Sequence, residues 1–473
     1  MSNSFIRHAV IFGIGTVLIP VAGIVLLPLY TNYLVPGEMG TQELVNRIAE
    51  VIGICAMSAG IQQATHAFYL HAKNKRQKDS LAATLLALFL GAIFCGSLIL
   101  APLLLTFHRS LGVDNPAALF VGIGSFLILV SLEIPLGLMR CRLESIRFVI
   151  CSVLLFLFRV GGTVYTVAVL QQGIWGVWIA TAAVASVFAL LLYWNEMRLG
   201  SFLPDFSQAG QIIRFSLPLV PGGILLFLLF HGDRFFLVWF WDNAEVGLYA
   251  TGYKIASVAA MCSATPLLRV WAVYQYDWML RPNGGEICAR WFLRLTVLYS
   301  FFGLVVALFC PELLRLIAQK SYLSAAGVVA PLVLADLFLN LSYMLEGVFY
   351  VFRRTILKLY VNLIATAATL TFYACLIPRY GMYGAAWGTA LGYFVLFLCT
   401  LAFGRRVYLI PLPWFRFLVT LLGGIALVAV ASMLELTSVK VVALLVGTGL
   451  FVGVTAYSVG GSDSGESPAS NSS

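Results

Sequence analysis

Charged side chains are scarce in this chain. Asp, Glu, Lys and Arg make up only 10% of its 473 residues, whereas a soluble domain usually has about 25%. Apolar residues make up 61%, and the mean hydropathy is +0.95. Apolar runs recur along the whole length, and a helix of roughly 20 such residues crosses the ~30 Å hydrocarbon core of a bilayer. This composition excludes an ordinary soluble enzyme and predicts an all-α membrane protein.

Signatures of catalysis and of metal binding are also missing. The nine cysteines are odd in number, form no CxxC pair and mostly lie within apolar runs, as small hydrophobic residues do. The five histidines are not accompanied by a Ser/His/Asp arrangement, an acidic pair or a metal-ligand spacing. We therefore expect a protein that is not an enzyme and has no cofactor.

Fourteen transmembrane helices are predicted from the apolar runs. They lie near residues 10–34, 43–70, 81–107, 117–139, 148–170, 176–194, 215–240, 246–270, 292–310, 328–352, 359–377, 384–403, 417–434 and 440–460. With the N-terminus inside, the inner loops hold 18 Lys and Arg residues and the outer loops hold 5. Such a bias is the positive-inside signal and places both termini in the cytoplasm. The net charge of +9 is therefore explained by topology, and no nucleic-acid partner is expected.

The chain is similar to itself when it is offset by 207 residues. This offset aligns the stretch from Phe5 with the stretch from Ile212 and superposes several residues without a gap: Gly15 on Gly222, Glu38 on Glu245, Gly40 on Gly247, and the cation Arg47 on the cation Lys254. An offset of 208 later aligns GIWGVWIATA with GMYGAAWGTA. Repeated bundles of this kind are typical of transporters that work by alternating access.

The repeat predicts how the chain is organised. An offset of six helices preserves orientation, so the two halves are parallel repeats related by an axis along the membrane normal. We expect an N-terminal lobe at 1–205 and a C-terminal lobe at 206–410, each of six helices. Two additional helices follow at 411–460. The Ser- and Gly-rich tail at 461–473 is predicted to be a disordered cytoplasmic segment.

Ionisable residues inside the predicted helices are the candidate functional residues, because each costs roughly 2.5–3.5 kcal/mol at the bilayer centre on insertion scales. Four cations are candidates for binding substrate: Arg47, Arg159, Arg234 and Lys254. The repeat would bring Arg47 and Lys254 to opposite walls of one cavity. Arginine binds phosphate oxygens through two parallel hydrogen bonds. The set therefore favours a phosphate-bearing substrate.

Internal pairing is the alternative role for these cations. Glu43, Arg47 and Glu50 fall at i, i+4 and i+7 on one helical face, so Arg47 can be neutralised by its own helix. Asp233 and Arg234 are adjacent and point in different directions, so no simple pairing between them is expected. Three acids are candidates for ion or proton coupling: Asp233, Asp336 and Glu346. For Asp336 and Glu346 the alternative is packing against an arginine.

Several sequence motifs carry a family resemblance. They are LYTNYLVPGEMGTQELV, RFSLPLVPGG followed by DRFFL, EVGLYATGYKIASV and RYGMYGAAWGTALGY. The chain resembles the Wzx-type polysaccharide flippases of the multidrug, oligosaccharidyl-lipid and polysaccharide exporter superfamily. The resemblance extends from residue 5 to about residue 395, roughly four-fifths of the chain. Asp233 and Arg234 match that family's DR motif, whereas Arg47 and Lys254 rest on the internal repeat.

The resemblance implies an activity and a location. It implies movement of an undecaprenyl-diphosphate-linked oligosaccharide from the inner to the outer leaflet of a bacterial inner membrane through a cationic central cavity. The implied partners are that substrate, membrane lipids and other polysaccharide assembly proteins. The alternatives are a multidrug or organic-cation antiporter of the same superfamily, a lipid II flippase, a membrane glycan polymerase or ligase, and a structural scaffold.

Overall fold

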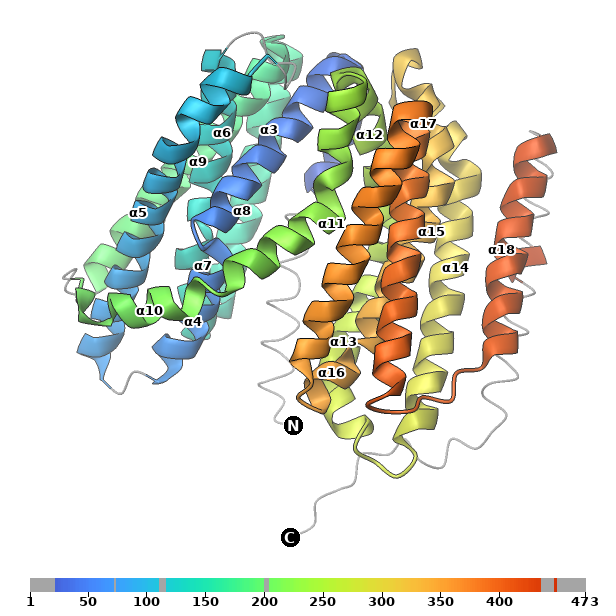
Figure 1. Ribbon diagram of the computed structural model, residues 1–473. Coiled ribbons are helices and arrows are strands. Elements are labelled where there is room, and N and C mark those ends of the chain that lie inside the picture. The colour runs from blue at the N-terminus through green and yellow to red at the C-terminus, as the bar shows by residue number, and fades with distance from the viewer. Residues whose placement is uncertain (1–21, 72–73, 110–115, 200–203, 435–445, 449–473) are drawn as a thin grey trace. The chain divides into compact units, whose positions relative to one another are not determined.

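The computed structural model describes residues 22–71, 74–109, 116–199, 204–434 and 446–448. Every regular element in these ranges is a helix (Figure 1), which confirms the predicted all-α class. The helices are α2 (Leu27–Tyr33), α3 (Pro36–Cys55), α4 (Ser58–His71), α5 (Lys75–Phe107), α6 (Pro116–Ser131), α7 (Glu133–Cys141), α8 (Ser145–Val164), η1 (Tyr165–Val169), α9 (Gly173–Leu199), η2 (Phe206–Gln208), α10 (Ala209–Ser216), α11 (Leu219–Phe240), α12 (Asn243–Cys262), α13 (Ala264–Trp278), α14 (Gly284–Ile317), η3 (Lys320–Ala325), α15 (Ala326–Leu345), α16 (Gly347–Val351), α17 (Thr355–Arg405) and α18 (Trp414–Leu434).

Many of these helices are long and apolar enough to cross a membrane. Over the described residues there are 8 such helices, or up to 10 when each of two bent pairs is counted as one span. Most of the predicted span at 440–460 and nearly half of the one at 10–34 lie outside these residues. The number fourteen therefore stays a prediction.

The two bent pairs occupy equivalent positions in the predicted repeats. Helices α3 and α4 are bent by 50°, and α12 and α13 by 51°. An offset of 207 carries the bounds of α3, Pro36 and Cys55, onto the bounds of α12, Asn243 and Cys262. Residue Met57, just after α3, has the unusual positive φ of 59°. The second helix of each repeat is thus broken at the same place.

Helix α17 is a hairpin. Its 51 residues would extend about 76 Å as one straight helix, more than twice the hydrocarbon thickness. Gly381, at φ 53° and ψ −132°, breaks it. The arms are joined by a 3.0 Å hydrogen bond between the Tyr373 and Thr389 hydroxyl groups. The predicted spans at 359–377 and 384–403 are its two arms.

The described residues form two compact units. Unit 1 consists of residues Met1–Thr251, Ile317–Tyr322 and Ile377–Met382, and unit 2 of Gly252–Leu316, Leu323–Leu376 and Tyr383–Ser473. These units do not follow the expected lobe boundary at 205/206, because residues 206–251 pack with unit 1. The division into six-helix lobes stays a prediction.

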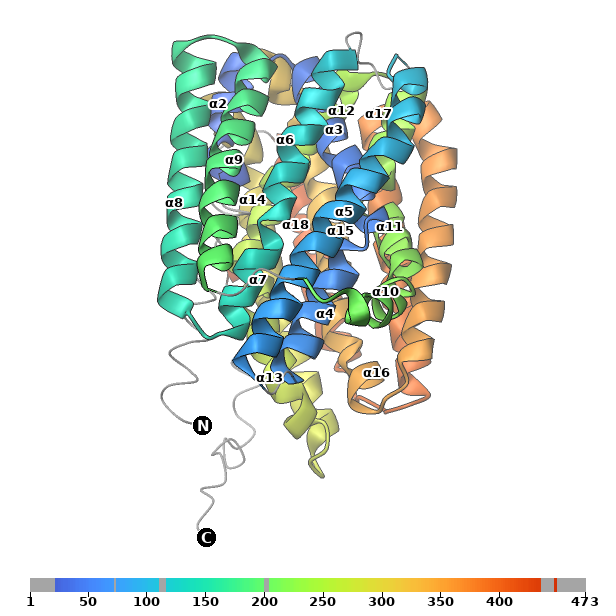
Figure 2. The same ribbon diagram turned by 90° about the vertical axis from the view of Figure 1, so that its left-hand side faces the viewer.

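Within unit 1, helix α9 packs between α6 and α8 (Figure 2). The C-terminal end of α9 is held by Arg142, which follows α7. Arg142 donates two parallel hydrogen bonds to Glu196 of α9, at 2.8 and 2.7 Å. Arg142 also donates to the Tyr69 hydroxyl of α4 at 2.8 Å. Although burial acts to lower it, these bonds raise the pKa of the Arg142 guanidinium above its usual range. The bidentate pair with Glu196 and the bond to Tyr69 together join the ends of α4, α7 and α9.

Helices α3 and α12 approach each other through two glycines. A Cβ atom on Gly40 would overlap the carbonyl oxygen of Asn243, and one on Gly247 would overlap that of Pro36. The Asn243 amide also donates to the Thr41 hydroxyl at 2.8 Å. Gly40 and Gly247 are the pair that the 207-residue offset superposes, so the two repeats contact each other through equivalent residues.

We expect Gly40→Ala to destabilise the protein, because the added methyl group meets backbone atoms that cannot turn aside. Overpacking of this kind typically costs about 1–3 kcal/mol. The matched control is Gly37→Ala in the same helix, where a Cβ has no atom within 4 Å. Thermal unfolding of the purified proteins in detergent should show a lower Tm for Gly40→Ala and an unchanged or slightly higher Tm for Gly37→Ala. Equal values for the two variants would contradict the close approach.

Candidate functional site

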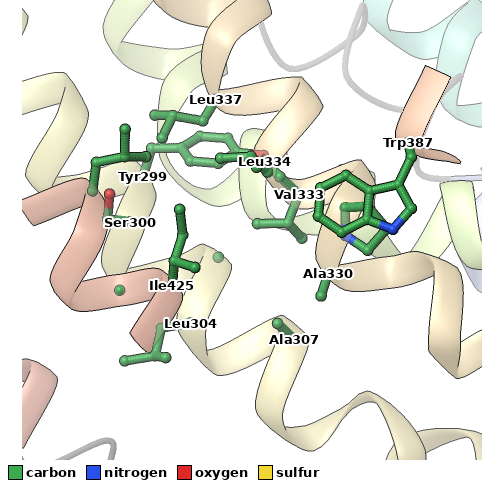
Figure 3. A pocket seen from close by; sticks show the side chains of 14 residues that line it. Tyr299, Ser300, Leu304, Ala307, Ala330, Val333, Leu334, Leu337, Trp387 and Ile425 are labelled. Atoms are coloured by element: carbon green, nitrogen blue, oxygen red, sulfur yellow. The ribbon is translucent and has the colours of Figure 1, made fainter. Parts of the chain in front are cut away.

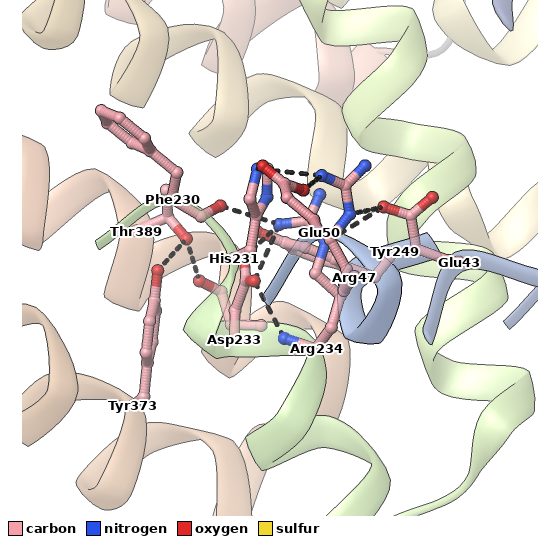
Figure 4. A network of polar contacts seen from close by, with 11 residues as sticks. Glu43, Arg47, Glu50, Phe230, His231, Asp233, Arg234, Tyr249, Tyr373 and Thr389 are labelled. Carbon is pink, nitrogen blue, oxygen red and sulfur yellow. Dashed lines mark hydrogen bonds and ion pairs between the residues drawn. The ribbon is translucent and has the colours of Figure 1, made fainter. Parts of the chain in front are cut away.

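Charged side chains from α3 and α11 meet inside unit 1 (Figure 4). Residues three or four positions apart lie on one face of a helix, so each helix presents a row of polar groups to the other. The residues of this α3–α11 network, with one contribution from α12, are Glu43, Arg47, Glu50, His231, Asp233, Arg234 and Tyr249.

Arg47 is enclosed by acids of its own helix. Its Nε donates to Glu43 Oε1 at 3.0 Å, and its Nη1 donates to Glu50 Oε2 at 2.5 Å. The predicted internal pairing on α3 is therefore confirmed. Nη1 is also 3.0 Å from His231 Nε2. Because a guanidinium can only donate, His231 accepts through Nε2 and carries its hydrogen on Nδ1. The Arg47 side chain keeps 22% of its surface exposed.

Arg234 pairs with the preceding residue, which corrects the expectation that Asp233 and Arg234 do not pair. Its Nη1 lies 2.7 and 2.9 Å from the two Asp233 carboxylate oxygens, and its Nε lies 3.5 Å from Glu43 Oε1. Neighbouring Cβ atoms do diverge, but the long arginine stem folds back over the adjacent carboxylate. Both side chains are almost completely buried, where an uncompensated charge costs several kcal/mol. Pairing therefore outweighs the unfavourable starting direction.

Tyr249 of α12 completes the environment of this pair. Its hydroxyl donates to Asp233 Oδ2 at 2.5 Å, and its ring lies under the Arg234 guanidinium at 5.1 Å. Asp233 also accepts from the Arg234 backbone N–H at 2.9 Å. The carboxylate thus satisfies the buried guanidinium and ties α11 to α12.

The other two predicted substrate cations are not part of this network in the described contacts. Arg159 of α8 is half-buried and its charge reaches the Tyr30 hydroxyl of α2. Its Nε is buried and has no hydrogen-bond partner among the residues described. Lys254 is half-buried on the part of α12 that belongs to unit 2. Substrate binding by either residue stays a prediction.

The two predicted coupling acids in unit 2 have different surroundings. Glu346 forms an ion pair with Lys358, and both side chains are largely buried. The alternative of packing against a cation thus applies to Glu346, with lysine in place of arginine. Asp336 of α15 is buried and has no ion pair within the described ranges. Its charge reaches the hydroxyl groups of Tyr299 and Tyr343.

Unit 2 also contains a pocket of about 290 Å³ between α14, α15, α17 and α18 (Figure 3). Its lining is almost wholly apolar, and the Tyr299 hydroxyl is turned to donate to the Val333 carbonyl at 3.1 Å. This chemistry suits a hydrocarbon chain and cannot replace the hydration of a phosphate. Over the described residues, no group of three His, Cys, Asp or Glu could hold a metal ion.

Sequence reasoning missed His231 and Tyr249 as members of the network. His231 precedes Arg234 by three residues and so lies on the same helical face, a signal that the sequence contains. The contact of Tyr249 with Asp233 joins two helices and has no local signal. The apolar pocket is likewise formed by side chains far apart in the sequence.

Comparisons with known proteins agree with this architecture. The model of a family described as "Polysaccharide biosynthesis protein" matches residues 33–272, just over half of the chain. No curated protein sequence matches.

Solved structures show the fold. The lipid II flippase MurJ, in an inward closed conformation, is similar with a TM-score of 0.73 and 12% identity, over 95% of this chain and 98% of that one. An inward-facing multidrug resistance MATE family transporter of the MOP superfamily has a TM-score of 0.59 and 17% identity, over 86% and 94%. A MATE transporter mutant from Vibrio cholerae has a TM-score of 0.52 and 14% identity, over 85% and 96%. The predicted all-α membrane-protein fold is confirmed.

We expect Asp233→Asn to destabilise the protein strongly. The change removes the charge of the Asp233 partner, while the Glu43 carboxylate is shared between Arg234 and Arg47. Breaking a buried ion pair from one side typically costs about 3–5 kcal/mol. The matched control is Asp277→Asn, which breaks the ion pair with Arg281. The Asp277 side chain is 64% exposed, so this change is expected to alter stability by less than about 1 kcal/mol. Thermal unfolding in detergent measures both. An equal, small effect of the two variants would show that the Asp233 pair does not support the fold.

Proposed function

Because the chain belongs to the polysaccharide biosynthesis protein family and has the fold of MurJ and the MATE transporters, we propose that it moves an undecaprenyl-diphosphate-linked oligosaccharide across a membrane. The family match and the apolar helices identify a multi-pass membrane protein, and the similarity to MurJ supports a role as a flippase. The proposal adds the substrate, the direction from the inner to the outer leaflet, and a bacterial inner membrane with both termini in the cytoplasm.

The surroundings of the Arg47 guanidinium support this proposal most strongly. Its guanidinium is half-buried within a membrane helix and already holds two carboxylates, at 3.0 and 2.5 Å. Carboxylate and phosphate oxygens bind a guanidinium through the same fork of N–H groups. We propose that the substrate diphosphate displaces Glu50, which is the most exposed of the acids at 35%.

Arg234 has a different role in this proposal. Its side chain is 2% exposed and is held by Asp233 and Glu43, so it first positions Glu43 beside Arg47. It becomes available to a phosphate only when Glu43 moves. Lys254 and Arg159 are proposed as further cations along the substrate path.

Transport needs a replacement for the water around the diphosphate and sugars, since burying an unpaired polar group costs several kcal/mol. The cations would replace the water around the diphosphate, while the prenyl tail stays in lipid. Alternating access by the two repeats would then expose the site to each leaflet in turn. The substrate must bind the two states differently to shift their populations. Asp336, buried without an ion pair among the described residues, is the proposed site of ion or proton coupling.

One observation fits the multidrug or organic-cation antiporter instead. In the α3–α11 network three carboxylates face two guanidiniums, with Glu43, Glu50 and Asp233 against Arg47 and Arg234. This excess of negative charge attracts a cationic substrate or a proton. A lipid II flippase would use the same cations as the proposed function. Identification of the transported lipid separates these candidates.

We expect Arg47→Gln to reduce export of the glycan about tenfold or more, because one charge-assisted hydrogen bond contributes about 1.5–3 kcal/mol. Arg47→Lys, which keeps the charge but loses the fork, should retain part of the activity. The control is Arg147→Gln, whose side chain is 62% exposed and pairs with Glu144. The measurement is the lipid-linked oligosaccharide that accumulates at the inner leaflet of cells expressing each variant at equal levels.

Two results would contradict the proposal. Normal export by Arg47→Gln at the wild-type protein level would remove Arg47 from the substrate path. A gene deletion that accumulates no lipid-linked oligosaccharide but changes drug tolerance would favour the antiporter.

A further inference from the structure

Four arginines gather where the two ends of helix α17 meet. Arg353 and Arg354 precede the helix, and Arg405 and Arg406 lie at its other end. The break at Gly381 folds the helix into a hairpin, and the hairpin brings residues about 50 positions apart in the chain to one place. A ring stack between Phe352 and Tyr408, with centroids 5.1 Å apart, fastens the two ends together.

An open depression of about 400 Å³ lies at this place. It is lined by Phe352, Arg354, Ile356, Leu357, Arg406 and Val407. Its two arginines are both exposed, as are their neighbours Arg353 and Arg405. The depression is therefore lined by both basic and apolar side chains.

Aromatic rings, not acids, hold the arginines at the C-terminal end of α17. Arg406 lies over the Phe403 ring at 5.5 Å, and Arg405 lies over the Trp414 ring at 5.2 Å. None of the four arginines forms an ion pair with a carboxylate in the part of the chain that the structure describes. Glu346, the acid nearest in sequence, pairs with Lys358 instead. This differs from Arg47 and Arg234, whose charges are already compensated.

The other two arginines follow a tight turn that ends α16. Arg353 has a φ of 55°, a left-handed conformation that costs a non-glycine residue about 1–2 kcal/mol. Here it forms the tight turn in which the Arg354 backbone N–H donates to the Phe349 carbonyl at 2.7 Å, and α17 starts at the next residue.

Exposed apolar side chains continue from the depression. Ile356 is 55% exposed, and Leu359 and Leu409 are also exposed. In a chain that spans a membrane, such side chains contact acyl chains. Basic pockets between membrane helices on the cytoplasmic side bind anionic headgroups, and the charge bias predicts that these loops lie on that side.

We propose that this depression is a binding site for an anionic phospholipid of the inner leaflet. The lipid phosphate contacts Arg354 and Arg406, and its acyl chains lie along Ile356 and Leu359. The site lies in unit 2 and is distinct from the α3–α11 network. It would anchor the α17 hairpin to anionic lipid, and it does not depend on the proposed substrate.

The test compares the binding of phosphatidylglycerol and phosphatidylcholine with identical acyl chains to the purified full-length protein, by native mass spectrometry. The wild type should prefer phosphatidylglycerol. In the double variant Arg354→Gln/Arg406→Gln, the ratio of phosphatidylglycerol binding to phosphatidylcholine binding should fall roughly tenfold to thirtyfold. Each basic residue near an anionic lipid surface contributes about 1 kcal/mol. The matched control Arg315→Gln/Lys320→Gln removes two exposed cations elsewhere and should keep it.

Three outcomes would overturn the proposal. The first is an unchanged lipid preference in the double variant. The second is displacement of the lipid by millimolar glycerol 3-phosphate that binds with the same arginine dependence, since this would identify a site for a soluble phosphate. The third is measured on the wild-type protein, so the proposal can be tested even if the double variant folds poorly. A photoactivatable phosphatidylglycerol should label peptides at 352–357 and 406–407, and labelling only elsewhere would contradict the site.

Discussion

The compensation of Arg234 is the constraint on which the interior of unit 1 depends. A guanidinium cannot lose its proton in a protein, so burying it inside a membrane helix requires acids beside it. Asp233 and Glu43 supply them from two helices, and Tyr249 from a third holds Asp233 in place. Arg47 then shares Glu43 and adds Glu50. The positions of α3, α11 and α12 are thus linked to one buried charge.

This arrangement changes how a cationic membrane site is understood. The predicted substrate cations do not all line an open, positively charged cavity, because Arg47 and Arg234 already bind carboxylates. In the proposed mechanism the entering phosphate replaces an acid that holds the same N–H groups, so the site would bind an anion by exchange. Exchange also leaves a displaced carboxylate that can accept a proton.

The sequence predicted the all-α membrane class, because bilayer thickness acts on local stretches of chain. It placed the two arms of α17 and the pairing of Arg47 with Glu43 and Glu50, since both depend on spacing along one helix. It failed for Asp233 and Arg234, where burial outweighs the directions of the Cβ atoms. It also missed Tyr249 and the ends of α17 as neighbours, because contacts between helices distant in sequence have no local pattern.

The meeting of Gly40 with Gly247 has a consequence for how such a chain can be built. Each glycine approaches the backbone at the start of the other helix, through Asn243 and Pro36, so the contact is reciprocal. A reciprocal contact between equivalent patches is the isologous form of a two-fold homodimer. The polypeptide therefore carries, within a single covalent chain, the self-complementary geometry by which two separate subunits would recognise each other.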